Sequence, residues 1–454
     1  MPEPDSIPSD HRGQVPDPHA PRQGSGWTVP AFRWWIAGLL FLGTALSFFD
    51  RQVLSVLAPT VTDELGMDSE QYSNVVAAFV LSYSIMFAVG GRFLDWAGTR
   101  RGMLICVSVW TVASAAHAWV RSAWHLGMLR FLLGAGEGGC FPGVTKAALE
   151  WFPLRQRSRA IGFAIGGAAI GAVLAPPLAT WMVGHVGWRG AFLVTGLFGA
   201  VWVLLWAVFY RPPRRSPFVS AAELAVIEED ARGGAPVEDE SDGFLSWPEL
   251  LRLRPVWGLI LTRFLLDPVM YLYLFWIPQY LSEARSATLA DIGRLAWIPF
   301  LTLDVANLLG GWVSDRLVRS GWSIGAARKT VMGVAALLTP ISIFSMYVQR
   351  MDVAVLLMSV LMFAHGFWIT NYITLTGDLL PPRSVGTVVG LCGCAGGLSG
   401  FLTTKLVGLV VKRFSYVPVF VAAGVLYPIG FLVILLTIGR VERIGAGRAR
   451  SASE

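Results

Sequence analysis

Charged side chains are scarce in this sequence: Asp, Glu, Lys and Arg make up 15% of its 454 residues, whereas a soluble domain carries about 25%. The apolar residues that replace them account for 54% of the chain and are gathered into long runs. About 20 such residues, coiled as a helix, cross the roughly 30 Å hydrocarbon core of a membrane. The shortage of charge therefore argues against a set of soluble domains, which the length alone would allow, and predicts a protein that spans the membrane.

Residues that mark other classes of protein are also few. The four cysteines lie in apolar runs with no histidine cluster beside them, so we expect packing residues and no metal site (Cys106, Cys140, Cys392 and Cys394). The sequence has no nucleotide-binding loop and no catalytic triad, which predicts a protein that is not an enzyme and needs no cofactor. The basic residues behind the net charge of +6 lie in short loops, where membrane topology explains them without a nucleic-acid partner.

The first 30 residues lack the apolar core of a signal peptide and are rich in Pro, Asp, Arg and His. We expect residues 1–30 to form a disordered cytoplasmic tail, with a second cytoplasmic tail at 441–454. The first apolar run, from Trp34 onward, must then act as an uncleaved insertion signal.

About twelve apolar runs follow, in two sets of six. The first set lies at about 33–57, 72–94, 102–120, 125–148, 158–183 and 189–210, and the second at about 256–282, 289–317, 328–348, 353–378, 384–411 and 416–439. A polar linker at 211–254 separates the two sets. This organisation predicts an all-α polytopic membrane protein of about twelve transmembrane helices in two six-helix halves, at 31–210 and 255–440.

Lysine and arginine are concentrated in alternate loops, which sets the expected orientation because these residues favour the cytoplasmic side. Most lie in the loops after the even-numbered runs (Arg92, Arg100, Arg101; Arg155, Arg157, Arg159; Arg211, Arg214, Arg215, Arg232; Arg316, Arg319, Arg328, Lys329). The loop after the first run has none. We therefore expect both termini in the cytoplasm, and a monomer embedded in the lipid bilayer of the plasma membrane.

A short motif occurs once in each half. Gly91–Arg101 ends the second run and Gly311–Arg316 ends the eighth, with the same Gly-to-Asp spacing and an offset of 220 residues. The same motif at the same place in two sets of six runs, separated by a linker, indicates a duplicated architecture. Two such halves with a binding site near mid-membrane between them are a known transporter plan.

With these features the sequence resembles the major facilitator superfamily. Gly91–Arg101 is similar to the loop motif of that superfamily, with Trp96 and Thr99 where basic residues are usual. Other stretches resemble its anion:cation symporter branch and, within it, the hexuronate transporters (Ser47–Arg51, Arg130–Gly143, Trp188–Phe192, Asp267–Pro278 and Gly377–Gly390). The resemblance covers about residues 33–440, and it departs at Phe48, where sugar-acid members often carry Tyr. It implies a bacterial inner-membrane transporter that couples proton entry to uptake of a small carboxylate.

Arg130 and Glu137 are seven residues apart in the fourth run, so they share one helix face about two turns apart. We expect them to line the same surface without bonding each other, and we place Arg130 in the substrate site. A carboxyl group kept from water favours its protonated form, which suits a proton carrier, and the resemblance implies this role for Glu137. The alternative is a structural ion pair with another helix, because a charge inside a membrane needs a partner.

Asp50 and Arg51 are neighbours, so their side chains diverge by about 100° around the first helix. We expect Arg51 to point into the central cavity and Asp50 to pair sideways with Arg130. A guanidinium group matches a carboxylate with two parallel hydrogen bonds, and the resemblance implies that Arg51 holds the substrate carboxylate. A purely structural pair is the alternative for Arg51, and Asp50 stays open between a proton site and a structural partner.

Further polar residues lie at span depth. Tyr83 matches a family tyrosine beside the substrate carboxylate, although a packed aromatic is the alternative. Asn371 and Thr374 are placed to hydrogen-bond sugar hydroxyls. Four others form a possible site in the second half (Asp267, Asp304, His365 and Lys405). A lone His such as His365 is more often an ordinary interior group, and the choice of Asp267 or Asp304 as the partner of Lys405 is open.

The repeated motif predicts a second kind of site. Asp95 and Asp315 lie at the cytoplasmic ends of spans, where a carboxylate can cap a helix and pair with arginine. The resemblance implies a gate that controls the conformation without touching the substrate. Its other expected members are Gly91, Arg100, Arg101 and Arg316.

The predicted function is symport, in which a proton on Glu137, helped by Asp50, and a sugar acid on Arg51 share one cavity. The nearest alternative is a proton-driven exporter of the same superfamily. Such exporters carry a fifth-span motif that ends in paired glycines, whereas Ala175–Ala179 lacks them, which disfavours export. A membrane sensor built like a transporter is a third possibility, and it would need a signalling domain.

Overall fold

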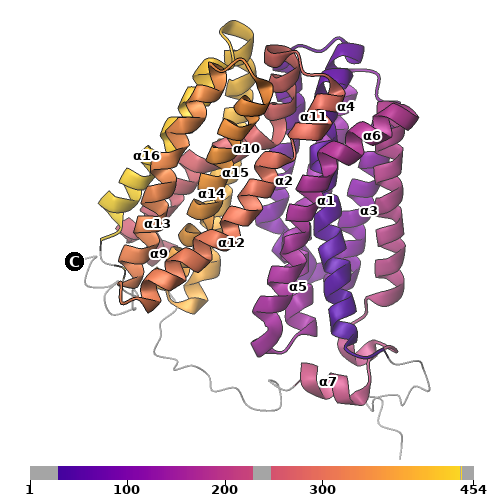
Figure 1. Ribbon diagram of the computed structural model, residues 1–454. Coiled ribbons are helices and arrows are strands. Elements are labelled where there is room, and N and C mark those ends of the chain that lie inside the picture. Colours follow the sequence, from indigo (N-terminus) through magenta and orange to yellow (C-terminus); the bar gives the residue numbers. More distant parts are fainter. Residues whose placement is uncertain (1–28, 229–246, 440, 442–454) are drawn as a thin grey trace, which may run out of the picture.

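The computed structural model describes residues 29–228, 247–439 and 441 (Figure 1). In these ranges the chain is helical and contains no strand. The predicted tails at 1–30 and 441–454 lie almost wholly outside the described residues, as does the middle of the predicted linker.

The helices fall into two groups joined by a linker with short helices of its own. The N-terminal half holds α1 (Phe32–Leu65), α2 (Ser69–Ala97), α3 (Thr99–Ala116), η1 (His117–Trp119), α4 (Ala123–Glu137), α5 (Cys140–Trp151) and α6 (Leu154–Phe209). The linker holds η2 (Pro213–Arg215), α7 (Ala221–Ile227) and α9 (Trp247–Arg252). The C-terminal half holds α10 (Arg254–Arg285), α11 (Leu289–Leu295), α12 (Ile298–Arg319), α13 (Ile324–Leu338), η3 (Thr339–Met346), α14 (Met351–Leu379), α15 (Pro382–Arg413) and α16 (Val417–Thr437).

The spans agree with the predicted apolar runs once two features of the N-terminal half are considered. Among the described residues, nine helices are long and apolar enough to cross a membrane, or ten if the bent α2 is counted as one span. The long α6 contains two predicted runs, because its backbone breaks at Gly187. The predicted fourth run is divided between α4 and α5, each too short to be counted alone. These two features account for the difference from twelve, and the predicted all-α polytopic architecture is confirmed.

Glycines with positive φ mark the turns between spans. Gly66 ends α1 at φ 61°, Gly98 separates α2 from α3 at φ 75°, and Gly187 bends α6 at φ 69°. Glycine adopts this region without the steric cost of a Cβ atom. The start of α2 is fixed by a capping box in which the Asp68 carboxylate accepts from the Gln71 amide. These turns let consecutive spans pack side by side.

The two halves are joined at one end of the bundle. We call this the α11 end, and the opposite end, which carries α7 and the described chain ends, the α7 end (Figure 1). Near the α11 end the Tyr72 hydroxyl donates to the Phe275 carbonyl oxygen at 2.8 Å. There the Lys412 ammonium group on α15 also contacts Asp68 at 2.9 Å and Glu70 at 2.8 Å. Towards the α7 end the ribbons of the two halves diverge.

Candidate substrate and proton site

A buried ion pair lies in the interior of the N-terminal half. Arg51 lies on α1 and Glu137 is the last residue of α4. Arg51 Nε donates to Glu137 Oε2 at 2.6 Å, and the side chains are 6% and 0% exposed, respectively. The Ser47 hydroxyl donates to the same oxygen at 3.1 Å and accepts from Arg51 Nη2 at 3.3 Å. Glu137 Oε1 has no partner among the described residues. The ion pair with another helix, an alternative left open for Glu137, is thus the arrangement in the structure.

Glycines on α4 bring Glu137 into the interior. A Cβ atom added at Gly136 would lie 2.7 Å from the Trp110 backbone nitrogen on α3, and one at Gly138 would lie 2.7 Å from the Tyr83 carbonyl oxygen on α2. Small residues allow such close approach of membrane helices. In the structure it is helices that fill the space beside these glycines.

Aromatic rings surround the guanidinium group of Arg51. Its Cζ atom lies 4.2 Å from the centre of the Tyr83 ring, 4.7 Å from that of Phe48 and 5.5 Å from that of Phe79. Ring faces attract a cation at these distances. Tyr83 therefore lies beside Arg51, and its place beside a substrate carboxylate stays a prediction. Phe48 supplies a ring face but no hydroxyl group.

Asp50 does not pair with Arg130, so this prediction is wrong. Its Oδ1 atom accepts from the Ser114 hydroxyl at 3.1 Å, and that hydroxyl lies 2.9 Å from the Thr195 hydroxyl. Ser114 is on α3 and Thr195 is on α6. The Asp50 side chain therefore points towards α3 and α6, whereas the Arg51 side chain points towards Glu137 on α4. The two neighbouring side chains diverge as the helical step requires.

Arg130 is buried with unused donors. Its exposed fraction is 2%, and its Nε and Nη2 atoms have no hydrogen-bond partner among the described residues. Its Cζ atom lies 5.9 Å from the centre of the Phe79 ring, which Arg51 also contacts. A buried charge with unpaired donors is costly unless an anion completes its bonds. The donors of Arg130 therefore suit an anionic ligand near Arg51.

A second ion pair lies on α10 in the C-terminal half. Arg263 Nη2 contacts Asp267 Oδ2 at 2.9 Å, one helical turn away. Lys405 pairs with neither Asp267 nor Asp304. Its ammonium group donates to the Asn74 side-chain oxygen on α2 instead. Arg263 was not predicted as a site residue from the sequence, although its i, i+4 spacing from Asp267 was a usable signal.

Aromatic rings connect the two ion pairs across the halves. Tyr271, one turn after Asp267, stacks on Phe275 with ring centres 6.2 Å apart. Phe275 meets Phe79 of α2 at 5.9 Å, and Phe79 lies 5.9 Å from Tyr83. The rings of α2 and α10 thus bring the environment of Arg51 and that of Asp267 to the same interface.

Asn371 and Thr374 donate to helix backbones. Asn371 Nδ2 donates to the Gly310 carbonyl at 3.1 Å and to the Phe367 carbonyl at 2.9 Å, and the Thr374 hydroxyl donates to the Thr370 carbonyl at 2.8 Å. The first of these bonds joins α14 to α12. Sugar recognition by these two side chains therefore stays a prediction, and their observed contacts are structural.

His365 and Asp304 differ in their surroundings. His365 is buried and its Nδ1 atom hydrogen-bonds the Tyr427 hydroxyl, which is the interior role left open for it. Asp304 is half-buried on α12, and no described residue forms a hydrogen bond or ion pair with its carboxylate. Asp304 does not join either ion pair.

The repeated carboxylates are held by cations other than those expected. Asp95 pairs with Lys146 of α5 at 2.5 Å. Asp315 pairs with Arg328 of α13 at 3.1 Å, and Arg328 lies 3.6 Å from Asp378. Each of these contacts stays within one half. Asp315 thus pairs with an arginine, although not with Arg316, whereas Asp95 pairs with a lysine and not with Arg100 or Arg101.

The other expected gate residues lie elsewhere. Arg100 donates to the Ala207 carbonyl at 2.6 Å, whereas Arg101 and Arg316 are exposed and bond no described residue. Gly91 is exposed, and a Cβ atom there would meet nothing within 4 Å. The structure thus shows no packing reason for glycine at this position.

Two helical halves, joined at one end and enclosing buried arginine–carboxylate pairs, define a polytopic membrane transporter. The comparisons with known proteins identify its family. The chain belongs to the Major Facilitator Superfamily, whose family model matches residues 40–404.

Curated relatives are similar to this chain over most of their own length. It is 31% identical to a hexuronate transporter of Escherichia coli strain K12, over 89% of this chain and 94% of the relative. It is 31% identical to a D-galactonate transporter of Escherichia coli O6:H1, over 90% and 96%. It is 33% identical to a galacturonate transporter of Dickeya chrysanthemi, over 68% and 90%. The predicted resemblance to the sugar-acid branch is confirmed, as is the prediction of a transporter rather than an enzyme.

Solved structures share the fold. A D-xylose-proton symporter matches with a TM-score of 0.71 at 16% identity, over 91% of this chain and 100% of the other. A bacterial homologue of the human lysosomal transporter Spinster, in an inward-facing and unoccupied conformation, matches with a TM-score of 0.70 at 18% identity, over 94% and 98%. At these identities the likeness supports the fold alone.

Proposed function

We propose that this protein is a proton-coupled symporter that takes up an organic anion, a hexuronate or a related sugar acid. The observation that carries the proposal is the water-excluded contact between Arg51 and Glu137. Arg51 suits the substrate carboxylate because a guanidinium group bonds both carboxylate oxygens. In the structure Glu137 occupies that position itself.

Coupling follows from this competition. A proton that neutralises Glu137 weakens its hold on Arg51, and the carboxylate of the substrate takes its place. Conversely, a bound substrate carboxylate repels a charged Glu137 and favours its protonated form. Each ligand thus promotes the binding of the other, and this mutual dependence is the thermodynamic meaning of coupling.

The unused donors of Arg130 supply a second reason to expect an anion in this region. A sugar acid has one carboxylate for Arg51, together with oxygens that Arg130 and the Tyr83 hydroxyl group can bind. The relatives named for hexuronate, galactonate and galacturonate transport support this substrate class.

We place the α7 end in the cytoplasm of a bacterial inner membrane, with both termini on that side and the protein acting as a monomer. The basic loops at this end support the assignment. The α11 end then faces outward and is closed by the contacts of Lys412 and Tyr72. Transport would require these contacts to open while the α7 end closes.

The test is uptake by purified protein in proteoliposomes, measured for a panel of labelled sugar acids. Inward pH and Na⁺ gradients are applied separately. We expect accumulation of a sugar acid with the pH gradient, and uptake that ignores this gradient would refute proton symport.

Glu137→Gln isolates the coupling step. This variant should lose gradient-driven accumulation yet retain exchange of internal for external substrate, because Arg51 is still present. Loss of both activities in a folded variant would make Glu137 a structural or substrate-binding residue instead. Asp352→Asn, at an exposed ion pair with Arg350, is the matched control.

A further inference from the structure

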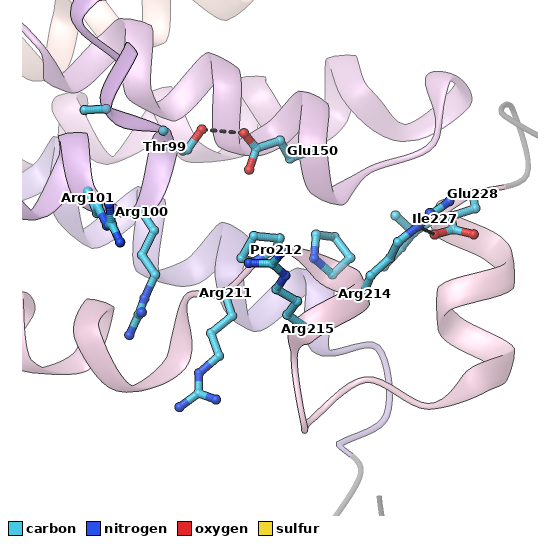
Figure 2. A pocket seen from close by; sticks show the side chains of 13 residues that line it. Thr99, Arg100, Arg101, Glu150, Arg211, Pro212, Arg214, Arg215, Ile227 and Glu228 are labelled. Atoms are coloured by element: carbon cyan, nitrogen blue, oxygen red, sulfur yellow. Dashed lines mark hydrogen bonds and ion pairs between the residues drawn. The ribbon is translucent and has the colours of Figure 1, made fainter. Parts of the chain in front are cut away.

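A basic pocket lies at the α7 end of the N-terminal half. Its wall consists of Ala97–Arg101 between α2 and α3, Glu150 on α5, Arg211–Arg215 after α6, and Ile227 and Glu228 at the end of α7. The cavity has a volume of about 910 Å³. Figure 2 shows Arg100 and Arg101 on one side of it and Arg214 with Glu228 on the other.

Positive charge exceeds negative charge in this pocket. Five arginines line it, against two glutamates (Arg100, Arg101, Arg211, Arg214 and Arg215; Glu150 and Glu228). The Glu150 carboxylate accepts from the Thr99 hydroxyl and, at 2.7 Å, from the Tyr210 hydroxyl. Glu228 contacts Arg214 at 2.6 Å. Glu150 forms no ion pair with these arginines among the described residues.

Several guanidinium donors are therefore available. Arg100 uses Nη2 for the Ala207 carbonyl, but its Nε atom is buried and unpartnered among the described residues. The side chains of Arg101, Arg211 and Arg215 bond no described residue. Like charges held around one space repel each other, and an anion between them removes that repulsion.

Topology alone does not explain this arrangement. The preference of basic residues for one side of the membrane places arginines in loops, but it does not require them to surround a cavity. Here two separate segments, Thr99–Arg101 and Arg211–Arg215, bring them to the same cavity. Guanidinium groups are well suited to phosphate, to which they donate parallel hydrogen bonds.

The position of the pocket favours a lipid as the source of the phosphate. It lies where α2 and α6 end, beside side chains suited to lipid: Trp96 is 82% exposed and Val208 is 54% exposed. Tryptophan favours the boundary between acyl chains and headgroups. We propose that this pocket binds the phosphate headgroup of an anionic phospholipid, whose acyl chains lie along the apolar surface beside it. The proposal is independent of the transported substrate.

Binding is tested with the full-length protein purified in an uncharged detergent. The probe is dihexanoyl phosphatidylglycerol below its micelle concentration, with dihexanoyl phosphatidylcholine and glycerol 3-phosphate as comparisons. Native mass spectrometry counts bound molecules, and thermal unfolding reports stabilisation. We expect saturable binding of phosphatidylglycerol and little of phosphatidylcholine. Equal or tighter binding of glycerol 3-phosphate would assign the pocket to a free phosphate compound and overturn the lipid proposal.

Variants locate the site. Arg211→Gln combined with Arg215→Gln should weaken phosphatidylglycerol binding by about tenfold or more, because two charge-assisted contacts are lost. The same positions changed to lysine should keep most of the affinity, which separates loss of charge from loss of fold. Arg319→Gln, at the exposed last residue of α12, is the control and should bind like the native protein.

Two further results would overturn the proposal. One is native affinity in the double glutamine variant, which would place bound lipid elsewhere. The other concerns the acidic residues Glu238–Glu240 of the linker, which lie outside the described residues. If their change to glutamine or asparagine creates lipid binding that the native protein lacks, the pocket belongs to this segment of the chain.

Discussion

Glu137→Gln should tighten binding of the transported acid and make its affinity independent of pH. In the proposed mechanism an incoming carboxylate has to displace Glu137 from Arg51, which Glu137 contacts at 2.6 Å. Glutamine keeps an acceptor but removes the charge, and the contribution lost is about 1.5–3 kcal/mol on the scale of charge-assisted hydrogen bonds. Since about 1.4 kcal/mol is a factor of ten in Kd, affinity should rise roughly tenfold to a hundredfold where native Glu137 is ionised.

The assay is calorimetric titration of the purified variant with a hexuronate, from acidic to alkaline pH. Native affinity should rise as the pH falls, because protonation of Glu137 frees Arg51. The variant should bind the hexuronate with the same high affinity at every pH. A variant that is folded, yet binds with native pH dependence, would refute the competition between Glu137 and substrate. Asp352→Asn should titrate like the native protein.

Three other changes probe the closed α11 end, the packing of α4 and the second carboxylate. Lys412→Gln should favour opening at the α11 end, seen as faster labelling of a cysteine introduced there. The same contact should weaken at acidic pH: the Gln71 amide and Lys412 hold the pKa of Asp68 below its usual range, so its stabilising charge is lost only when the pH falls through that lowered value. Gly136→Ala should lower the free energy of unfolding by about 1–3 kcal/mol, because the added methyl group overpacks against α3. Thermal unfolding measures this loss. Asp50→Asn tests whether Asp50 carries a second proton. If it does, native uptake of a monovalent acid moves net charge and responds to membrane potential, whereas uptake by the variant is electroneutral and does not respond.

The architecture could be predicted because its signal is spread over many residues. Each apolar run of about 20 residues identifies a span without reference to any other part of the chain. Where the helices of the structure depart from that pattern, a local cause is visible. Gly187 bends α6 without ending its apolar character, and Gly138 with Gly139 divides α4 from α5.

Charge pairing was predicted less well, because a partner on another helix depends on packing. The sequence places Asp50 and Arg51 on different sides of α1, which the structure bears out. It does not indicate that Ser114, rather than Arg130, meets Asp50. The same limit applies to Asp95, whose partner Lys146 lies on α5, 51 positions away in the chain.

The proposed proton coupling depends on close packing as much as on charge. Side chains larger than hydrogen at Gly136 and Gly138 would clash with the backbones of α3 and α2. With α4 displaced, the 2.6 Å contact between Glu137 and Arg51 would lengthen, and water would enter the gap. Water would solvate both ions separately and reduce the competition between Glu137 and a substrate carboxylate. The glycines of α4 thus matter to coupling because they keep this competition strong, although they bear no charge themselves.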